Sequence, residues 1–294
     1  MRRICPNPNC ACPIFVIKDG KFKRKDDSKI IQRYRCKTCL ARFSSATFSF
    51  AYRHKKRRVN APLAKLFASG VSQRRAAVLM GVHHKTVELK FLAIARLARR
   101  KNEELLHKFK ARVFNAQLDD LITKENSKLK PLSVSIVVDE DRRLILGTKV
   151  SSIPAFGHLA DIARKKYGPR KDNHAQKLRE LFSEVAPLIS REVVIKSDEH
   201  KFYPSAIREF FPRSKHLQFK SERGCIAGQG ELKKVGFDPL FVINHTCAML
   251  RANINRLIRK TWCTTKNPHR LQDHLDIFTY FYNRQLLKRY LTPL

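Results

Sequence analysis

The stretch VFNAQLDDLIT, residues 113–123, decides how the larger part of this chain folds. Its length and apolar residues predict a β-strand, yet two adjacent acids, Asp119 and Asp120, lie in its middle. Successive side chains of a strand point to opposite faces, so the two carboxylates should lie on opposite sides of a sheet. Because an acid is out of place in an apolar strand, Asp119 is a candidate catalytic residue.

Strand and helix patterns alternate after this stretch. Strands are predicted at SVSIVV and LILGTKVSS, which the charged turn DEDRR joins, and at EVVIKSD and HLQF. Helices are predicted at AQKLRELFSEV, with Leu178, Leu181, Phe182 and Val185 on one face, and around PSAIREFF. This order of elements indicates a mixed α/β sheet with helices packed against it.

Two further acids follow predicted strands. Asp198 ends EVVIKSD, where a crevice would open beyond the carboxyl ends of the strands. Asp139 belongs to the turn DEDRR, where we expect charged side chains to be solvated, and it is excluded. Sites that cleave DNA with two metal ions are built from carboxylates, and Mg²⁺ prefers oxygen ligands. Asp119 and Asp198 therefore make half of a metal site.

The apolar run FVINHTCAMLRANINRL, residues 241–257, is predicted to be part of one helix. Asp238 is a suitable N-cap and Pro239 suits the first helical position, so the helix should continue to about residue 260. At about 100° per residue, one face is apolar and comprises Leu240, Ile243, Cys247, Leu250, Ile254 and Leu257. Asn244 falls at the edge of this face.

Five of the eight cysteines lie in the first 39 residues, which favours metal ligation over a disulfide framework. The knuckles CPNPNC and CKTC are separated by two strand patterns, IFVI and IIQRYR, with a polar turn between them. Four thiolates suit tetrahedral zinc, and the bound metal supplies folding energy to so small a module. We predict a structural Zn²⁺ ion held by Cys5, Cys10, Cys36 and Cys39 in a zinc ribbon over residues 1–45, with Cys12 as the alternative to Cys10.

The remaining cysteines and the single tryptophan carry no motif. We expect Cys225, Cys247 and Cys263 to be core thiols, and Trp262 to pack against the protein rather than to stack on a nucleic-acid base.

Residues 53–105 are predicted to form a helix-turn-helix module that begins with a basic linker, RHKKRRVN, at residues 53–60. Ser72 can cap the helix SQRRAAVLM, Gly81 makes the turn, and a second helix starts near His83. The early residues of the second helix would enter a major groove. The predicted contacts to bases or phosphates are His83, His84, Lys85, Thr86 and Lys90. A plain helical hairpin is the alternative.

The charge of the chain points to a polyanionic partner. Against 25 Asp and Glu residues stand 61 Lys and Arg residues, a formal net charge of +36 spread over the whole length. Such an excess favours DNA or RNA, because each neutralised phosphate releases counterions. No apolar run is long enough to cross a bilayer, and the N-terminus has no secretory h-region, so we expect a soluble, cytoplasmic protein.

The succession CPNPNC, QRYRCKTC, SGVSQRRAAVLMGVHHKTV, QLDDL, IKSDEH and LRANINRLIRKTWCTTK resembles insertion-sequence transposases that combine a zinc ribbon, a helix-turn-helix and an RNase H-like catalytic domain of the DDE type. The resemblance covers nearly the whole chain and implies a catalytic domain at residues 110–294. In this family, metal ions are held by an Asp in the first strand, an Asp after the fourth, and an acid on a helix after the fifth. These positions fall on Asp119, Asp198 and Asn244, so the third acid is replaced by an amide. Asn244 is selected over His245, and Glu231 is a possible substitute ligand.

The resemblance also implies a reaction. A water molecule activated by Mg²⁺ or Mn²⁺ would hydrolyse a phosphodiester bond at the element end, and the resulting 3′-hydroxyl would attack target DNA. Double-stranded DNA, as element ends and as target, is the implied partner. Candidate phosphate contacts are Arg251, Arg256, Arg259, Lys260 and the segment KKYGPRK at residues 165–171. Such transposases commonly act as dimers or larger synaptic complexes, although no segment here has the pattern of a heptad zipper.

Two other functions fit the sequence. An inactivated derivative would still bind inverted repeats without cleaving them, and the amide at Asn244 is the feature that favours this alternative. A basic zinc-ribbon protein of RNA assemblies fits the charge equally well, but it leaves the positions of Asp119 and Asp198 unexplained.

Overall fold

The computed structural model describes residues 4–220, 238–258 and 262–291. It divides into two compact units, Met1–Ala64 and Lys65–Leu294, which are described separately below. Among the described helices, none combines the length and the apolar composition that crossing a membrane requires. The division between the units falls within helix α1 (Asn60–Ala68), so the helices predicted for residues 72–100 lie in the second unit, together with the sheet.

The first unit contains a three-stranded antiparallel sheet of β1 (Val16–Lys23), β2 (Ile30–Cys36) and β3 (Arg42–Ser44), in that order. The predicted pairing of the first two strands is confirmed. The expected polar turn is wrong in part, because its first half continues β1 through an irregularity at Gly20, where φ is +76°. Short 3₁₀ helices follow at Ser45–Phe48 and Arg57–Val59. The guanidinium of Arg57 in the basic linker lies 2.8 Å from the Asp26 carboxylate.

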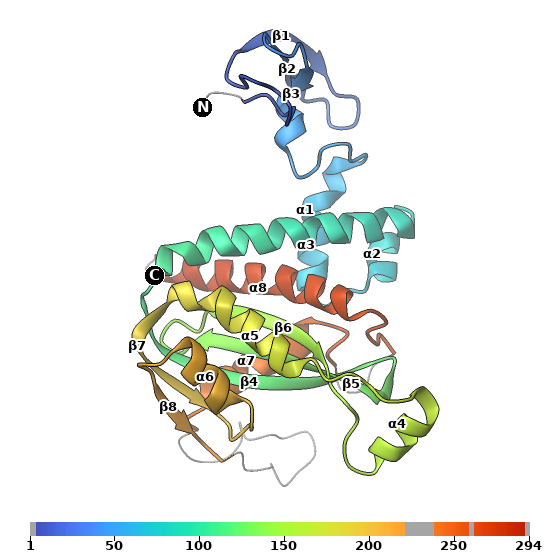
Figure 1. Ribbon diagram of the computed structural model, residues 1–294. Helices are drawn as coiled ribbons and strands as arrows, with labels where there is room; N and C mark the ends of the chain where they lie inside the picture. Colours follow the sequence, from blue (N-terminus) through green and yellow to red (C-terminus); the bar gives the residue numbers. More distant parts are fainter. Residues whose placement is uncertain (1–3, 221–237, 259–261, 292–294) are drawn as a thin grey trace. The chain divides into compact units, whose positions relative to one another are not determined.

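A five-stranded mixed sheet forms the centre of the second unit (Figure 1). Its strands are β4 (Val113–Glu125), β5 (Ser127–Asp139), β6 (Ile145–Ser152), β7 (Ile189–Ser197) and β8 (Lys215–Gln218), arranged in the order β6-β5-β4-β7-β8. The pairs β4–β5 and β5–β6 are antiparallel, whereas β4–β7 and β7–β8 are parallel. The predicted mixed α/β architecture is confirmed, and the acid-bearing strand β4 is its central strand.

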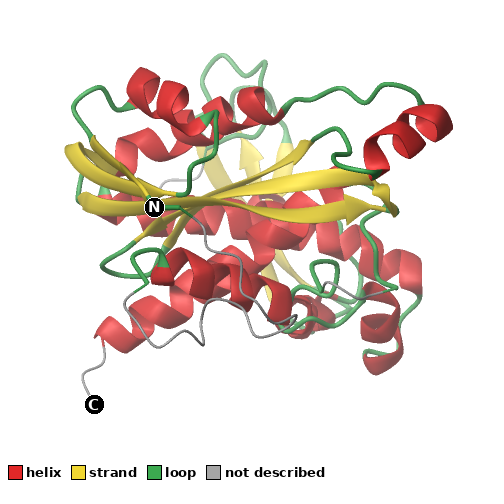
Figure 2. Ribbon diagram, turned by 90° about the horizontal axis from the view of Figure 1, so that it is seen from below, coloured by secondary structure: helices red, strands yellow, loops and turns green. Residues whose placement is uncertain are grey.

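Helices cover both faces of this sheet, which Figure 2 shows edge-on. The helices after α1 are α2 (Gln73–Leu79), α3 (His84–Leu106), α4 (Leu159–Tyr167), α5 (His174–Val185), α6 (Tyr203–Phe210), α7 (Phe241–Asn253) and α8 (Pro268–Leu291), with short 3₁₀ helices at His107–Phe109 and Ala186–Leu188. One buried cluster joins α5 and α6 to one face of the sheet, and a second joins α7 and α8 to the other face.

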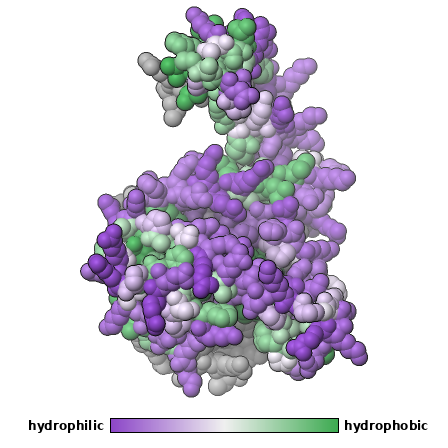
Figure 3. Space-filling view, viewed as in Figure 1, coloured by the Kyte–Doolittle hydropathy of each residue, from purple (hydrophilic) through white to green (hydrophobic). Residues whose placement is uncertain are grey.

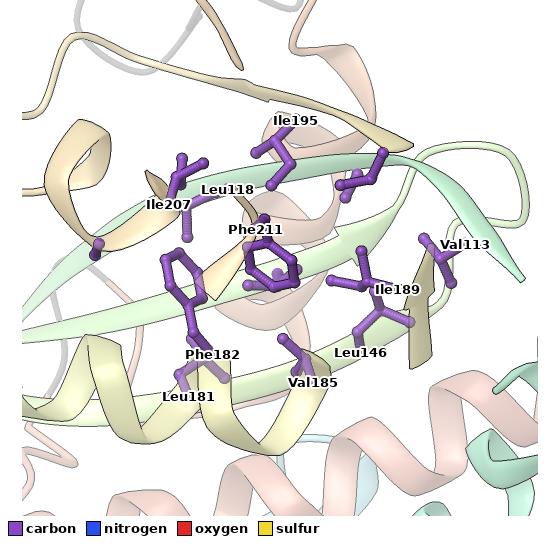
Figure 4. Packing of buried hydrophobic residues seen from close by; sticks show 14 of the residues in the cluster. Val113, Leu118, Leu146, Leu181, Phe182, Val185, Ile189, Ile195, Ile207 and Phe211 are labelled. Carbon is purple, nitrogen blue, oxygen red and sulfur yellow. The ribbon is translucent and has the colours of Figure 1, made fainter. Parts of the chain in front are cut away.

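The predicted apolar faces of both key helices are buried. In the first cluster, Leu181, Phe182 and Val185 lie on the side of α5 that packs against the strands (Figure 4). Each buried side chain of this size contributes roughly 1.5–3 kcal/mol relative to exposure. The six apolar residues predicted for the helix after Asp238 are also buried. That helix is shorter than predicted, because the backbone is extended at Ile254 and α7 ends at Asn253.

Helix α8 covers the open edge of the sheet with two side-chain amides. Gln272 accepts a hydrogen bond from the Val150 N–H (3.1 Å) and donates to the Thr148 carbonyl (3.1 Å). Asn283 accepts from the Ile145 N–H (2.9 Å) and donates to the Ile145 carbonyl (2.8 Å). These bonds satisfy backbone groups of β6 that another strand would otherwise pair.

Helices α2 and α3 have the local geometry that the sequence predicts. The Ser72 hydroxyl accepts a hydrogen bond from the Arg75 N–H, and Gly81 has a φ of +57° in the turn before α3. Helix α3 packs along α8 through Phe91, whose ring meets the His274 ring edge-on at 5.6 Å. The His274 ring also hydrogen-bonds the Phe67 carbonyl at 2.9 Å.

His274 makes the stability of this contact depend on pH. Burial lowers its pKa to about 4, below the ordinary value of 6.5. Between about pH 6.5 and pH 4, the His274 imidazole is therefore protonated in the unfolded chain but not in the folded chain. The free energy of unfolding falls as the pH drops through this range, by up to about 1.4 kcal/mol per pH unit.

We expect His274→Gln to remove this component of the pH dependence, because glutamine does not titrate. Unfolding in denaturant at several pH values between 4 and 7.5 measures it, and the stability gap between the two proteins should narrow as the pH falls. Parallel curves for the two proteins would contradict this assignment.

Candidate functional site

The two adjacent acids of β4 lie on opposite faces of the sheet, as the alternation of the strand predicts. Leu118 belongs to the buried cluster of α5 and α6, whereas Leu121 belongs to the cluster of α7 and α8. Asp120 shares the face of Leu118, and Asp119 shares the face of Leu121. The two carboxylates therefore have different neighbours, and their pKa values move in opposite directions.

Asp119 and Asp198 come close to each other because of the parallel pairing of β4 with β7. Ser197, the last residue of β7, is the register partner of Leu118, so Asp198 follows beside Asp119. Burial, together with the charges of Asp198 and Asp120, raises the pKa of Asp119 to about 7, against the lowering effects of the Asp120 N–H and of Arg251. Burial also raises the pKa of Asp198. Two carboxylates that disfavour each other's charge are a setting that a divalent cation stabilises.

Helix α7 is held over this pair by the buried side chain of Gln117, which is 1 % exposed. The Gln117 amide donates to the Pro239 carbonyl (3.0 Å) and accepts from the Ile243 N–H (2.9 Å). One side chain of the central strand therefore grips both the segment before α7 and its first turn, where N–H groups lack partners within the helix. Gln117 lies two residues before Asp119 and on the same face of β4.

Asn244 sits in the first turns of α7 with its amide oriented by an acid. Its Nδ2 donates to Asp238 Oδ2 at 3.0 Å, and Asp238 Oδ1 accepts from the Leu240 N–H at 2.8 Å. The reverse orientation of the amide would bring its oxygen against the carboxylate, so the Asn244 oxygen is the end turned away from Asp238. His245 does not share this environment, since its ring stacks on Phe241.

Three of the predicted site residues lie outside the described residues. These are the substitute ligand Glu231 and the candidate phosphate contacts Arg259 and Lys260; Cys225 lies there too.

The expectation that Asp139 is solvated is wrong. Asp139 is fully buried, and its carboxylate accepts hydrogen bonds from the N–H groups of Asp141 (3.0 Å) and Arg142 (3.1 Å). The Arg142 guanidinium lies 2.9 Å away as its ion-pair partner. Asp139 therefore fixes the turn between β5 and β6, and its exclusion from catalysis rests on these contacts instead of on solvation.

On the opposite face of β4, Asp120 joins two histidines that the sequence analysis did not single out. Asp120 Oδ2 lies 2.6 Å from His174 Nε2, and the Ser135 hydroxyl donates to Asp120 Oδ1 at 2.5 Å. The His200 ring meets the His174 ring at 5.0 Å. Burial alone would lower the pKa of His174, but its hydrogen bond to Asp120 raises it overall. In the sequence, only the acid pair Asp119–Asp120 and the stretch IKSDEH, which contains His200, point to this cluster. Neither pattern shows that Asp120, His174 and His200 lie close together.

The first unit brings the four predicted thiols together. The sulfur atoms of Cys5 and Cys39 are 3.5 Å apart, those of Cys10 and Cys36 are 3.6 Å apart, and all four could hold one ion. Four sulfurs around zinc lie roughly 3.8 Å from one another, given Zn–S bonds of about 2.3 Å. Cys12 is outside this group. A backbone N–H from Ala41 lowers the pKa of Cys39 to about 6, which favours the thiolate that zinc requires.

The predicted nucleic-acid contacts differ in accessibility. His83 and Lys85 at the start of α3 are exposed, and His84 and Thr86 are half-buried. Lys90 is only 3 % exposed, so the expectation that it meets DNA is wrong.

Three other residues also lie in environments that differ from the predicted ones. Arg256 lies over the Phe91 ring at 6.0 Å, and burial lowers its pKa, so it does not present a free surface charge. Trp262 is wholly exposed and Cys263 is exposed, so neither packs as expected. The exposed Trp262 lines a cavity of about 370 Å³ with Arg74, Lys266 and Arg270.

Comparisons with known proteins give little to extend this picture. No protein-family model and no curated protein matches the chain. Three solved structures overlap with it at low similarity: the Mos1 strand transfer complex (12% identity, TM-score 0.29), the Mos1 mariner paired end complex with Mn (10%, 0.30) and a pre-cleavage Mos1 transpososome (11%, 0.22). Each covers 79% of this chain and 76% of the other. These values are too low to carry fold or function over from those complexes.

Because Gln117 makes two buried hydrogen bonds to the start of α7, replacing its amide by an apolar group of similar size should lower the free energy of unfolding. Gln117→Leu keeps the volume but leaves the Ile243 N–H and the Pro239 carbonyl without this partner. Each buried polar group left unpaired costs roughly 1–3 kcal/mol. We expect denaturant unfolding of the full chain to show a loss of about that size or more. Gln176→Leu, at an exposed position of α5, is the matched control and should change stability by under about 0.5 kcal/mol. Equal stability of the two variants would show that Gln117 does not hold the helix.

Proposed function

We propose that this protein is a DNA transposase whose divalent-cation site is formed by Asp119, Asp198 and Asn244. The observation that carries the proposal is the meeting of three elements. Asp119 lies in the central strand, Asp198 directly follows the parallel neighbour strand, and Gln117 holds the helix of Asn244 over the same face. Mg²⁺ or Mn²⁺ is the proposed cofactor, because all three side chains offer oxygen ligands.

Asp238 gives the amide at Asn244 a defined role. An amide oxygen can ligate Mg²⁺ but brings no charge, so its orientation matters more than that of a carboxylate. The hydrogen bond from Nδ2 to Asp238 fixes that orientation and adds a nearby negative charge. The replacement of the third acid is therefore compatible with a working site.

The chain's own residues would position the reaction. Bound cations would activate the attacking water or 3′-hydroxyl and stabilise the leaving oxygen. Arg251 lies on the same face of α7 as Asn244, about two turns further along the helix. It is close enough to lower the pKa of Asp119, and we propose that it binds a phosphate of the incoming DNA. Hydrolysis would leave a 3′-hydroxyl on the element end, and its attack on target DNA would complete strand transfer.

DNA binding is proposed for the accessible basic residues of both units. Hydrophilic residues cover most of the face that Figure 3 shows for the second unit. The contacts that we propose there are His83, His84, Lys85 and Thr86 at the start of α3, the basic segment 165–171 that begins in the last turn of α4, and Arg251. Recognition of terminal inverted repeats by the zinc-ribbon and helix-turn-helix segments, and assembly into a homo-oligomer with two DNA ends, belong to the same proposal.

A DNA-binding protein without catalysis is the second candidate, and the missing third carboxylate favours it. This candidate predicts binding of the element's ends with no strand cleavage in Mg²⁺ or Mn²⁺.

We expect the wild-type protein to nick duplexes that carry the element's ends. Asp198→Asn should reduce nicking on the order of 10²–10³-fold, as loss of one transition-state contact typically does. Asp161→Asn, at an exposed position of α4, is the control and should nick normally. Asn244→Asp should also reduce nicking, because it places a second carboxylate about where Asp238 now accepts a hydrogen bond.

Binding without nicking by the wild-type protein would support the second candidate instead. An increase in nicking by Asn244→Asp or Asn244→Glu would show that the site has decayed from a three-acid one.

A further inference from the structure

On the face of the sheet opposite Asp119, Asp120, His174 and His200 form a cluster that the proposed DNA cleavage does not use. We propose that these three residues bind a transition-metal ion, with Zn²⁺ as the expected one. The ligand atoms of the three side chains all lie within 4.8 Å of one another. The cluster does not depend on the proposed function, because its geometry stands whether or not the chain cleaves DNA.

Three separate elements contribute the ligands. Asp120 comes from the central strand β4, His174 is the first residue of α5, and His200 lies between β7 and α6. His174 and His200 follow Asp120 in the chain by 54 and 80 residues, yet the fold brings all three side chains together. An ion bound there would link a strand, a helix and a loop, as structural metal ions in small domains do.

The groups around the three ligands suit a metal site. The Ser135 hydroxyl donates a hydrogen bond to Asp120 Oδ1. The other carboxylate oxygen, Oδ2, faces His174 and is the one that would bind the metal ion. Supporting hydrogen bonds of this kind orient the carboxylate ligands of metal ions. The His174 N–H of the backbone donates to Asp172 Oδ1 at 2.9 Å, which fixes the start of α5 and hence the ring.

Tyr203 is a second, independent indication. Its side chain is fully buried, and its hydroxyl makes no well-formed hydrogen bond among the described residues, although the Asp120 carboxylate is its polar neighbour. A buried hydroxyl that is not fully satisfied is costly, and a bound ion or its coordinated group would satisfy it. The Tyr203 ring packs 4.9 Å from the His200 ring, so the hydroxyl belongs to the same buried pocket of polar groups.

The donor set selects the kind of metal. Two imidazoles and one carboxylate suit Zn²⁺ and similar ions, whereas Mg²⁺ prefers an all-oxygen set such as the one around Asp119. Ligands of tetrahedral zinc lie roughly 3.3 Å apart, given bonds of about 2.0–2.1 Å. The 2.6 Å hydrogen bond between Asp120 and His174 must therefore open by under about 1 Å, and its proton leaves as the ion binds.

Such an ion would also steady one residue of the proposed cleavage site. The His200 backbone N–H donates to Asp198 Oδ1 at 3.2 Å. If the imidazole of His200 is held by zinc, the backbone that carries Asp198 is held too. This consequence rests on the proposed function, whereas metal binding itself does not.

Zinc content per chain tests the proposal. The full-length protein is reconstituted with Zn²⁺, freed of unbound ion by gel filtration, and measured by mass spectrometry for zinc and by amino-acid analysis for protein. We expect two equivalents in the wild type, one at the four thiolates and one at Asp120, His174 and His200. Cys36→Ser should lose the first, and His200→Gln the second.

Asp120→Asn and Asp119→Asn form a matched pair on opposite faces of one strand. The first should bind one equivalent and the second two. Loss of all zinc from a folded Cys36→Ser protein, or an unchanged zinc content in His200→Gln, would overturn the proposal. Thermal unfolding of each variant identifies any loss of folding, and half-buried His200 is the decisive position because its substitution removes least from the core. A protein that keeps both equivalents but does not nick DNA would refute the proposed function and leave this site standing.

Discussion

The buried amide of Gln117 is the interaction on which the arrangement of the candidate site depends. Helix α7 packs directly against β4 and β5. Its apolar face fits the sheet in many registers, since hydrophobic packing is not directional. The two hydrogen bonds of Gln117 select one register, because both a carbonyl and an N–H of the α7 start must meet one amide. Asn244 follows Ile243 in sequence, so the same two hydrogen bonds also set its position relative to β4.

The central strand serves two different environments through the alternation of its side chains. Asp119 faces α7 with Asp198 nearby, and burial together with like charge raises its pKa to about 7. Asp120 is buried as well, but the His174 imidazole and the Ser135 hydroxyl stabilise its charge, and its pKa is lowered. The same residue type, one position apart, thus has its pKa shifted in opposite directions by its surroundings. One face suits a divalent cation with oxygen ligands, and the other suits an ion that prefers nitrogen.

Much of the fold could be predicted from the sequence because it depends on local periodicity. The alternation in β4 and β5, the apolar face of α5 and the Gly81 turn are each visible in about ten residues. The sequence also predicts that Asp119 and Asp198 belong to one site, and the parallel register of β4 with β7, which sets Leu118 opposite Ser197, is what brings them together. The roles of these residues in catalysis, the zinc ribbon as a zinc-bound module and the helix-turn-helix as a DNA reader remain predictions.

The errors arise where contacts between distant residues decide the environment. The helical pattern predicts that Lys90 is exposed, but it is buried. The turn composition predicts that Asp139 is solvated, but it is buried and paired with Arg142. His174, His200 and Gln117 have no pattern that marks them, because their partners are brought in by the sheet topology and not by spacing.

Anomalous diffraction from crystals of the protein soaked with Mn²⁺ tests the proposed cation site most directly. We expect an Mn²⁺ peak between the carboxylates of Asp119 and Asp198, with the Asn244 amide oxygen as a ligand. A peak that avoids Asp119, or an Asn244 oxygen turned away from the ion, would contradict it.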